Sequence, residues 1–393
     1  MNSVAGTSTL GVSAKAISRT GTVPWLSWAG LIASVCISSG IYWDISWHET
    51  IGRDTFWTPA HLLTQFGAVL AGLASSWVIF GTTLAGSSES RQNSVNVLGF
   101  RAPLGAFILA WGAAAMLTSA PFDNWWHDAY GLDVKIISPP HILLALGIFG
   151  VNWGAAFLAS AEMSRAQGAQ RRMLQYVLLA AAGFVLIQSM VLLLEQTGKV
   201  SQHSAITYAV VCFPLPFLLE TFARASEHRW GRTIVAGTYT LFCVLMVWIL
   251  PLFPAQPKLG PVYQKVTHMV PLPFPLLIVV PAFFLDLIWP RLKQASTWVQ
   301  AAVAGMVFLA ALIAVQWPFA TFMMSPAANN WFFANTDFPY FAQPEWPEVR
   351  HVFVLWETTA LAFWRNIGIA VLASILSVRV GMSFGNWFHR VKR

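Results

Sequence analysis

The stretch from Asp44 to His61, D-I-S-W-H-E-T-I-G-R-D-T-F-W-T-P-A-H, decides how the rest of this chain is interpreted. It lies between two long apolar runs and holds an acid, two histidines and further charges where its neighbours have almost none. A second copy, D-N-W-W-H-D-A-Y-G-L-D-V-K-I-I-S-P-P-H, runs from Asp123 to His141. Each copy has Asp, then His four residues on, then a second His just after Thr-Pro or Ser-Pro-Pro. The repeated spacing indicates two related sites.

The composition around these stretches is that of an integral membrane protein. Of 393 residues, 56% are hydrophobic and only 10% are charged, whereas about a quarter of a soluble domain is charged. Runs of about 20 apolar residues, long enough to cross a bilayer as a helix, recur along the chain. The net charge of +7 does not indicate nucleic-acid binding, because the basic residues gather on one side of the expected membrane.

We expect an all-α fold of about ten transmembrane helices arranged as repeated helical hairpins. The apolar runs place them near residues 24–43, 59–84, 103–121, 139–162, 172–194, 204–223, 232–253, 270–290, 297–321 and 352–380. Residues 1–23 are expected to be a disordered cytoplasmic tail. Residues 24–172 form a four-helix part with both Asp/His/His stretches, and 173–393 supply six further helices.

The charges predict the orientation. Of the 23 lysines and arginines, sixteen fall in the tail and the even-numbered connections, six in the odd-numbered connections, and Arg365 lies within a span. Cytoplasmic loops carry the excess of positive charge, so both termini should be cytoplasmic and the Asp/His stretches extracytoplasmic. We expect a bacterial inner or intracytoplasmic membrane. The long outer loop at about 322–351, rich in aromatics and proline, is expected to form a lid.

Other polar residues within the spans have simpler interpretations. Glu220 and Asp286 lie near the expected cytoplasmic helix ends, where their carboxylates can reach water. Cys36, Cys212 and Cys243 each lie in an apolar run, which predicts small buried side chains rather than disulfides or thiolate metal ligands.

Each copy can bring one carboxylate and two imidazoles together. If the first helix continues by one turn, Asp44 and His48 lie on one face. Thr58 can then cap the next helix and leave His61 in its first turn. Asp123, His127 and His141 repeat the arrangement, with Ser138 as the cap.

Such a donor set suits copper, zinc or non-haem iron. A hydrogen-bonded Asp–His pair that merely fixes a helix–loop corner is the alternative. Arg53, Asp54 and Asp128 are candidates to orient the imidazoles, and Asp54 or Asp128 is expected to accept a proton from a ligand histidine.

The first copy resembles a known family. Asp-x3-His, then Arg-Asp-Thr, then Thr-Pro-x-His is similar to the signature of the C subunit of particulate methane and ammonia monooxygenases, in the copper membrane monooxygenase superfamily. Asp44, His48 and His61 fall on its copper ligands. Asp123, His127 and His141 match the spacing of a second copper set, although Asp replaces the family's amide. The resemblance covers about residues 40–145.

The resemblance implies copper, O2 and a small apolar or ammonia-like substrate. It also implies other membrane subunits and a soluble cupredoxin-type subunit, and a homo-oligomer stays open. The residues alone support a metal at the outer boundary, so two other functions stay open. The chain could hold or deliver copper without catalysis, or it could be a structural subunit of a membrane respiratory assembly.

Overall fold

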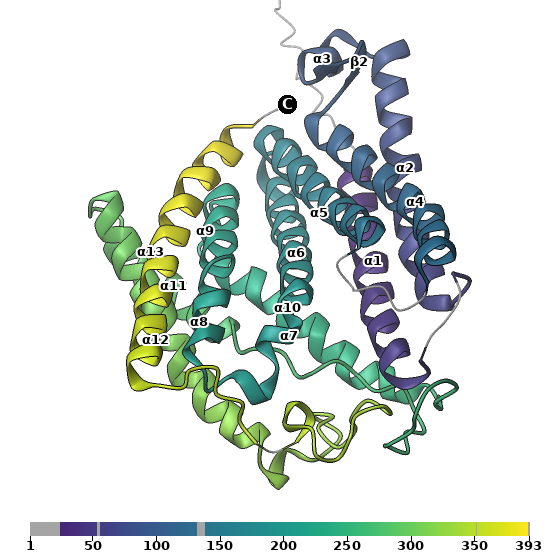
Figure 1. Cartoon of the computed structure of the whole chain (residues 1–393). Helices are drawn as coiled ribbons and strands as arrows, with labels where there is room; N and C mark the ends of the chain where they lie inside the picture. Colours follow the sequence, from purple (N-terminus) through teal and green to yellow (C-terminus); the bar gives the residue numbers. More distant parts are fainter. Residues whose placement is uncertain (1–23, 53–55, 132–137, 351, 392–393) are drawn as a thin grey trace, which may run out of the picture.

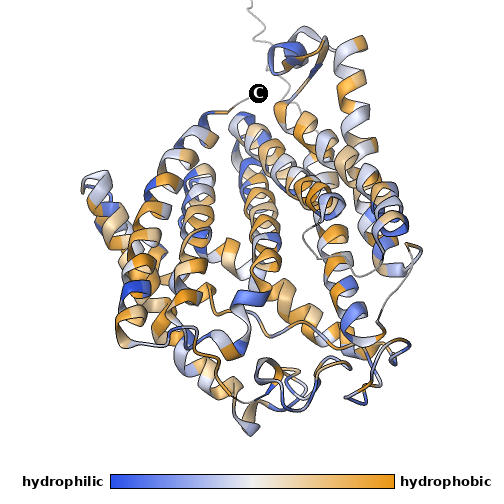
Figure 2. Cartoon of the chain, in the orientation of Figure 1, coloured by the Kyte–Doolittle hydropathy of each residue, from blue (hydrophilic) through white to orange (hydrophobic). Residues whose placement is uncertain are grey.

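The computed structural model describes residues 24–52, 56–131, 138–350 and 352–391. Within these ranges, nine helical segments are long and apolar enough to cross a bilayer, with mean hydropathy from 1.4 to 2.2. Figure 2 shows them largely in hydrophobic colours, with hydrophilic colours gathered at the helix ends and in the loops. The chain is therefore an all-α integral membrane protein, apart from one small β-hairpin.

The first part of the chain is two helical hairpins joined by that β-hairpin (Figure 1). The β-hairpin pairs Val95 with Ala102 and Val97 with Phe100. The elements are α1 (Trp25–Thr50), α2 (Pro59–Ala85), α3 (Ser88–Gln92), β1 (Val95–Val97), β2 (Phe100–Ala102), α4 (Leu104–Tyr130) and α5 (Pro139–Arg165).

Glycines allow the helices of each hairpin to lie very close. A Cβ on Gly112 of α4 would stand 2.4 Å from the backbone nitrogen of Val151 in α5. Gly40 of α1 likewise packs against Thr64 of α2. Small residues at helix interfaces are the usual device where lipid removes the hydrophobic drive for association.

Both predicted sites lie at the same end of this four-helix part. Gly105 packs against Leu158, and Gly112 packs against Val151, so α4 and α5 are antiparallel. Contacts of Gly40 with Thr64 and of Gly67 with Ile37 make α1 and α2 antiparallel too. Helices α2 and α4 also run in opposite directions. The last turns of α1 and α4 therefore lie at the same end of the bundle as the first turns of α2 and α5.

The second part adds α6 (Gly168–Leu192), α7 (Leu194–Thr197), α8 (Ala205–Cys212), α9 (Leu215–Ser226), α10 (Gly231–Ile249), α11 (Val279–Leu292), α12 (Thr297–Met323) and α13 (Ala360–Arg390). Short 3-10 turns lie at Lys199–Ser201, Leu250–Leu252, Pro326–Ala328 and Pro347–Val349. The largest apolar core joins α5 and α6 to helices α8 to α13.

The eighth predicted span, 270–290, is wrong in its first half. Helix α11 begins only at Val279 and has 14 residues, which cover about 21 Å at 1.5 Å per residue and fall short of the roughly 30 Å hydrocarbon layer. Pro271, Pro273 and Pro275 explain the late start. Each lacks an N–H and disfavours helical backbone in the residue before it.

Two other boundaries differ for related reasons. The predicted span 204–223 is divided at Phe213 and Pro214 into α8 and α9. The last helix begins at Ala360 rather than 352, with Thr359 as its cap. Conversely, α1 and α4 run on to Thr50 and Tyr130, so both carry their Asp-x3-His residues on helix, as the spacing predicted.

Glu220 and Asp286 were expected to reach water, and this prediction is wrong. Both residues are 2% exposed and share Arg232, whose Nε donates to Glu220 Oε2 at 2.9 Å and whose Nη1 donates to Asp286 Oδ1 at 2.9 Å. Glu220 also accepts from Arg224 Nε. Buried charges persist only where they are paired and hydrogen-bonded. The cluster joins α9, α10 and α11.

Irregular segments at 253–278, 324–350 and 352–359 cross the end of the bundle at which α1 ends (Figure 1). They attach to the last turn of α1. Lys258 N donates to Ile51 O at 2.9 Å, Val270 N to Thr50 Oγ1 at 2.8 Å and Tyr340 N to Glu49 O at 3.2 Å. The turn that carries His48 is thus held by the second part of the chain.

Candidate metal centre

The first corner is built by the end of α1 and the start of α2. Asp44 and His48 are one helical turn apart on α1. Thr58 caps α2 with its side chain, which accepts from His61 N at 3.4 Å, and Pro59 is the first helical residue. The local structure is the one that the Thr-Pro-x-His motif predicted.

Both imidazoles approach one carboxylate oxygen. His61 Nε2 lies 3.0 Å from Asp44 Oδ1, and His48 Nε2 lies 3.8 Å from the same atom. One ligand atom from each residue lies within 4.8 Å of the other two. Ligands at about 2.0–2.2 Å from a zinc-like ion stand roughly 3–4 Å apart, so the three atoms are spaced for one ion.

The protonation of His61 bears on this fit. Its Nδ1 lies 3.2 Å from the carbonyl oxygen of Phe56. A carbonyl only accepts hydrogen bonds, which places the ring proton on Nδ1 and leaves Nε2 as the atom that faces Asp44. Asp44 Oδ1 is buried and accepts no geometrically sound hydrogen bond. A metal ion between these two atoms would satisfy both of them.

The second corner repeats this design with a wider spacing. His127 Nε2 lies 3.4 Å from Asp123 Oδ2, and His141 Nε2 lies 3.6 Å from Asp123 Oδ1. The carboxylate thus offers a separate oxygen to each ring. His127 Nδ1 faces the carbonyl of Gly131 at 3.2 Å, and Asp123 Oδ1 is buried without a hydrogen bond. In the described part of the chain, only the first corner gathers all three ligand atoms within 4.8 Å.

One detail of the second corner differs from expectation. Ser138 stands at the cap position of α5, but its side chain makes no capping hydrogen bond. Its hydroxyl is buried without a partner. Two prolines, Pro139 and Pro140, begin this helix, and Pro140 at its second position has no N–H for the serine to accept from.

The residues expected to orient the ligands are only partly described. Arg53 and Asp54 lie outside the described residues. Asp128 is exposed and accepts from Asn124 Nδ2 at 3.4 Å. Its role toward a ligand histidine stays a prediction. Two ligand rings are oriented instead by backbone carbonyls, those of Phe56 and Gly131, which no side-chain motif reveals.

Tryptophans around the corners divide into two groups. Trp57 and Trp125 are exposed, as interfacial residues are. Trp43, Trp47 and Trp126 turn their indole nitrogens inward, where these atoms are buried without a hydrogen bond. Trp43 also stacks on Phe253 at 5.8 Å.

No family model, curated protein or solved structure matches this chain.

Proposed function

We propose that this protein is a copper-binding membrane subunit of an oxygenase-type complex that oxidises a small apolar or ammonia-like substrate with O2. The observation that carries the proposal is the convergence of His48 Nε2 and His61 Nε2 on the buried Asp44 Oδ1. Two imidazoles and a carboxylate suit copper, with zinc and non-haem iron as competitors. The resemblance of the first motif to the monooxygenase C subunit favours copper.

In this proposal, Asp44, His48 and His61 hold one ion, and Asp123, His127 and His141 hold a second or supporting one. The ion supplies the redox chemistry toward O2. The chain itself positions the ligands: the Phe56 carbonyl faces Nδ1 of His61, so that the Nε2 atom of this ring is directed at Asp44. The sites face the extracytoplasmic side, and other membrane subunits and a soluble cupredoxin-type subunit complete the complex.

A second candidate is a protein that holds or delivers copper without oxygenase activity. The helical segments that follow Arg172 favour it, because they lie beyond the stretch that resembles the monooxygenase subunit. The two candidates share the metal site and differ in whether the bound ion consumes O2.

The decisive experiment is metal analysis of the purified protein with His61→Ala and His268→Ala. His268 is a matched control, because it also lies 3.0 Å from a carboxylate, that of Asp337, in the irregular segments attached to the end of α1. We expect His61→Ala to lose at least about tenfold in copper affinity and His268→Ala to keep wild-type affinity. Equal copper content in both variants would overturn the metal site. Bound copper without O2 consumption by the assembled complex would support the second candidate, a protein that holds or delivers copper.

A further inference from the structure

A groove lies between α2, α4 and the β-hairpin, which packs over the ends of these helices away from the two Asp/His/His corners (Figure 1). Its volume is about 210 Å³, and seven of the eight residues that line it are apolar. Four of these are exposed: Phe80, Leu98, Phe100 and Trp111. An apolar cavity of about 150 Å³ holds benzene, so the groove has room for a stretch of hydrocarbon chain.

The groove lies at the depth of lipid acyl chains. Helix α2 has 27 residues, or about 40 Å at 1.5 Å per residue, and so extends roughly 5 Å beyond a 30 Å hydrocarbon layer at each end. Ile79 and Phe80 lie six and five residues before its last residue, Ala85, or about 8–9 Å along the axis. These lining residues are therefore within the hydrocarbon layer, while α3 and the β-hairpin lie at the level of the headgroups.

Two arginines are attached to the end of α2 at that level. The carbonyl of Thr83, one turn beyond Ile79 and Phe80, accepts from Arg91 Nη2 at 3.4 Å. The hydroxyl of Thr83 accepts from Arg101 N at 2.8 Å. Among the described residues, neither guanidinium has an ion-pair partner. Arginine binds phosphate through charge-assisted hydrogen bonds, so two uncompensated cations border the groove where a phospholipid carries its phosphate.

The tip of the β-hairpin also indicates a ligand. Leu98 has a φ of +51° and is 92% exposed, and Asn96 Oδ1 holds the turn by accepting from Gly99 N at 3.0 Å. A left-handed backbone is unfavourable for a residue with a side chain, and strained positions of this kind cluster at ligand clamps. Contact with an acyl chain would remove the leucine side chain from water.

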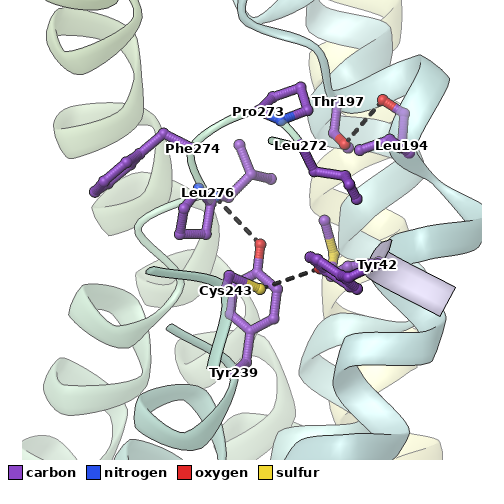
Figure 3. A pocket seen from close by; sticks show the side chains of 11 residues that line it. Tyr42, Leu194, Thr197, Tyr239, Cys243, Leu272, Pro273, Phe274 and Leu276 are labelled. Carbon is purple, nitrogen blue, oxygen red and sulfur yellow. Dashed lines mark hydrogen bonds between the residues drawn. The ribbon is translucent and has the colours of Figure 1, made fainter. Parts of the chain in front are cut away.

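The cavity inside the bundle differs from this groove (Figure 3). Its volume is about 30 Å³, enough for one or two water-sized spheres of about 10–15 Å³. The Cys243 thiol is hydrogen-bonded to the Tyr42 hydroxyl at 3.1 Å. The Tyr239 hydroxyl accepts from Leu276 N at 3.2 Å. The polar atoms of this cavity are thus partnered within the protein, whereas the arginines beside the groove keep donors for a ligand.

We propose that the groove between α2, α4 and the β-hairpin binds one anionic phospholipid, with an acyl chain along Phe80, Phe100 and Trp111 and its phosphate held by Arg91 and Arg101. The charge of the two arginines favours a lipid with net negative charge over a zwitterionic one. The site lies at the end of the bundle opposite the Asp/His/His corners and does not depend on the function proposed for them.

Native mass spectrometry of the purified full-length protein, titrated with phosphatidylglycerol or phosphatidylcholine, tests the proposal. We expect one phosphatidylglycerol to bind about tenfold more tightly than phosphatidylcholine. Ser76→Trp fills the groove and should abolish this binding, whereas Leu84→Trp is a matched control on α2, exposed and outside the lining. Arg91→Gln/Arg101→Gln should remove the preference for phosphatidylglycerol. Arg172→Gln, which changes an exposed arginine in the first turns of α6, should keep it.

A second measurement needs no variant to fold. Phosphatidylglycerol with a photoreactive diazirine in its acyl chain should label wild-type protein within 104–111 of α4. Equal affinity of the wild type for the two lipids, or labelling confined to other helices, would overturn the proposal. The rival occupant is a second copy of the chain or another subunit. In that case Ser76→Trp would change the oligomeric state and leave lipid binding unchanged, which would also overturn it.

Discussion

At the scale of single residues, the arrangement of protons and lone pairs distinguishes the Asp/His/His corners from ordinary ion pairs. In each corner Nδ1 of one ring faces a backbone carbonyl, and one oxygen of the shared carboxylate is buried. A helix end held in this way presents its donors whether or not an ion is bound. That preorganisation is what a metal site needs.

Lys199 gives a prediction about pH. Burial lowers the pKa of its ammonium group from 10.5 to about 8, although its Nζ donates to Asn335 Oδ1 and faces the ring of Phe338. The unfolded chain therefore binds more protons between about pH 8 and 10.5, and stability rises with pH in that window. Below pH 8 the cost of the buried charge is fully present.

We expect Lys199→Met to remove this rise. The melting temperature of the wild type in detergent should increase from pH 8 to pH 10 relative to that of Lys199→Met. Lys258→Met is the control, since Lys258 is exposed and should keep the wild-type slope. Parallel curves for the wild type and Lys199→Met would contradict the prediction.

At the scale of elements, the contact between α4 and α5 depends on glycines that leave no room for a side chain. The Cβ of alanine at position 112 would lie 2.4 Å from Val151 N and 2.7 Å from the Gly147 carbonyl oxygen. The helices must separate to admit it. This pair of helices also carries the second corner, with Asp123 on α4 and His141 on α5.

Gly112→Ala should therefore destabilise the protein by about 1–3 kcal/mol, the usual cost of overpacking. Gly81→Ala in α2 is the matched control, because a Cβ there meets nothing within 4 Å, and a helical alanine is favoured over glycine. Steric trapping would measure the free energy of unfolding of the wild type and of both variants. A loss of stability equal in both variants would show that the close contact is not the cause.

At the scale of the whole molecule, the two parts of the chain meet at the last turn of α1. Thr50 is fully buried, and its Oγ1 accepts from Val270 N at 2.8 Å and donates to Ser46 O at 2.6 Å. Gly52, with φ +103°, allows Tyr340 to pack over this turn. The irregular segments thereby position the end of the helix that carries Asp44 and His48.

Thr50→Val should leave the amide of Val270 buried without an acceptor, at a cost of about 1–3 kcal/mol. We expect faster hydrogen exchange at Val270 and weaker metal retention at the first corner. Thr240→Val is the control, since its hydroxyl bonds only the Ala236 carbonyl of its own helix. An unchanged rate of hydrogen exchange at the Val270 amide in Thr50→Val would show that its hydrogen bond to Thr50 Oγ1 does not hold the segment to α1.

The sequence by itself determined the membrane class, the helical hairpins of the first part and the grouping of each Asp/His/His set. All three follow from local physics: apolar run length, the helical period that stacks Asp44 on His48, and the Thr-Pro cap that places His61. Composition alone excluded a soluble fold, because too few residues are charged to cover one.

Only the tertiary structure decided the rest. The proline-rich segment of an apparent span stays irregular because Tyr239 and Gln316 satisfy its amides from other helices. Glu220 and Asp286 are buried because Arg232 pairs with both. The carbonyls that orient the histidines belong to the backbone. The partners of the buried amides and of the Glu220–Arg232–Asp286 cluster come from other helices, and the two carbonyls belong to the main chain. No pattern of side chains in the sequence therefore specifies these contacts.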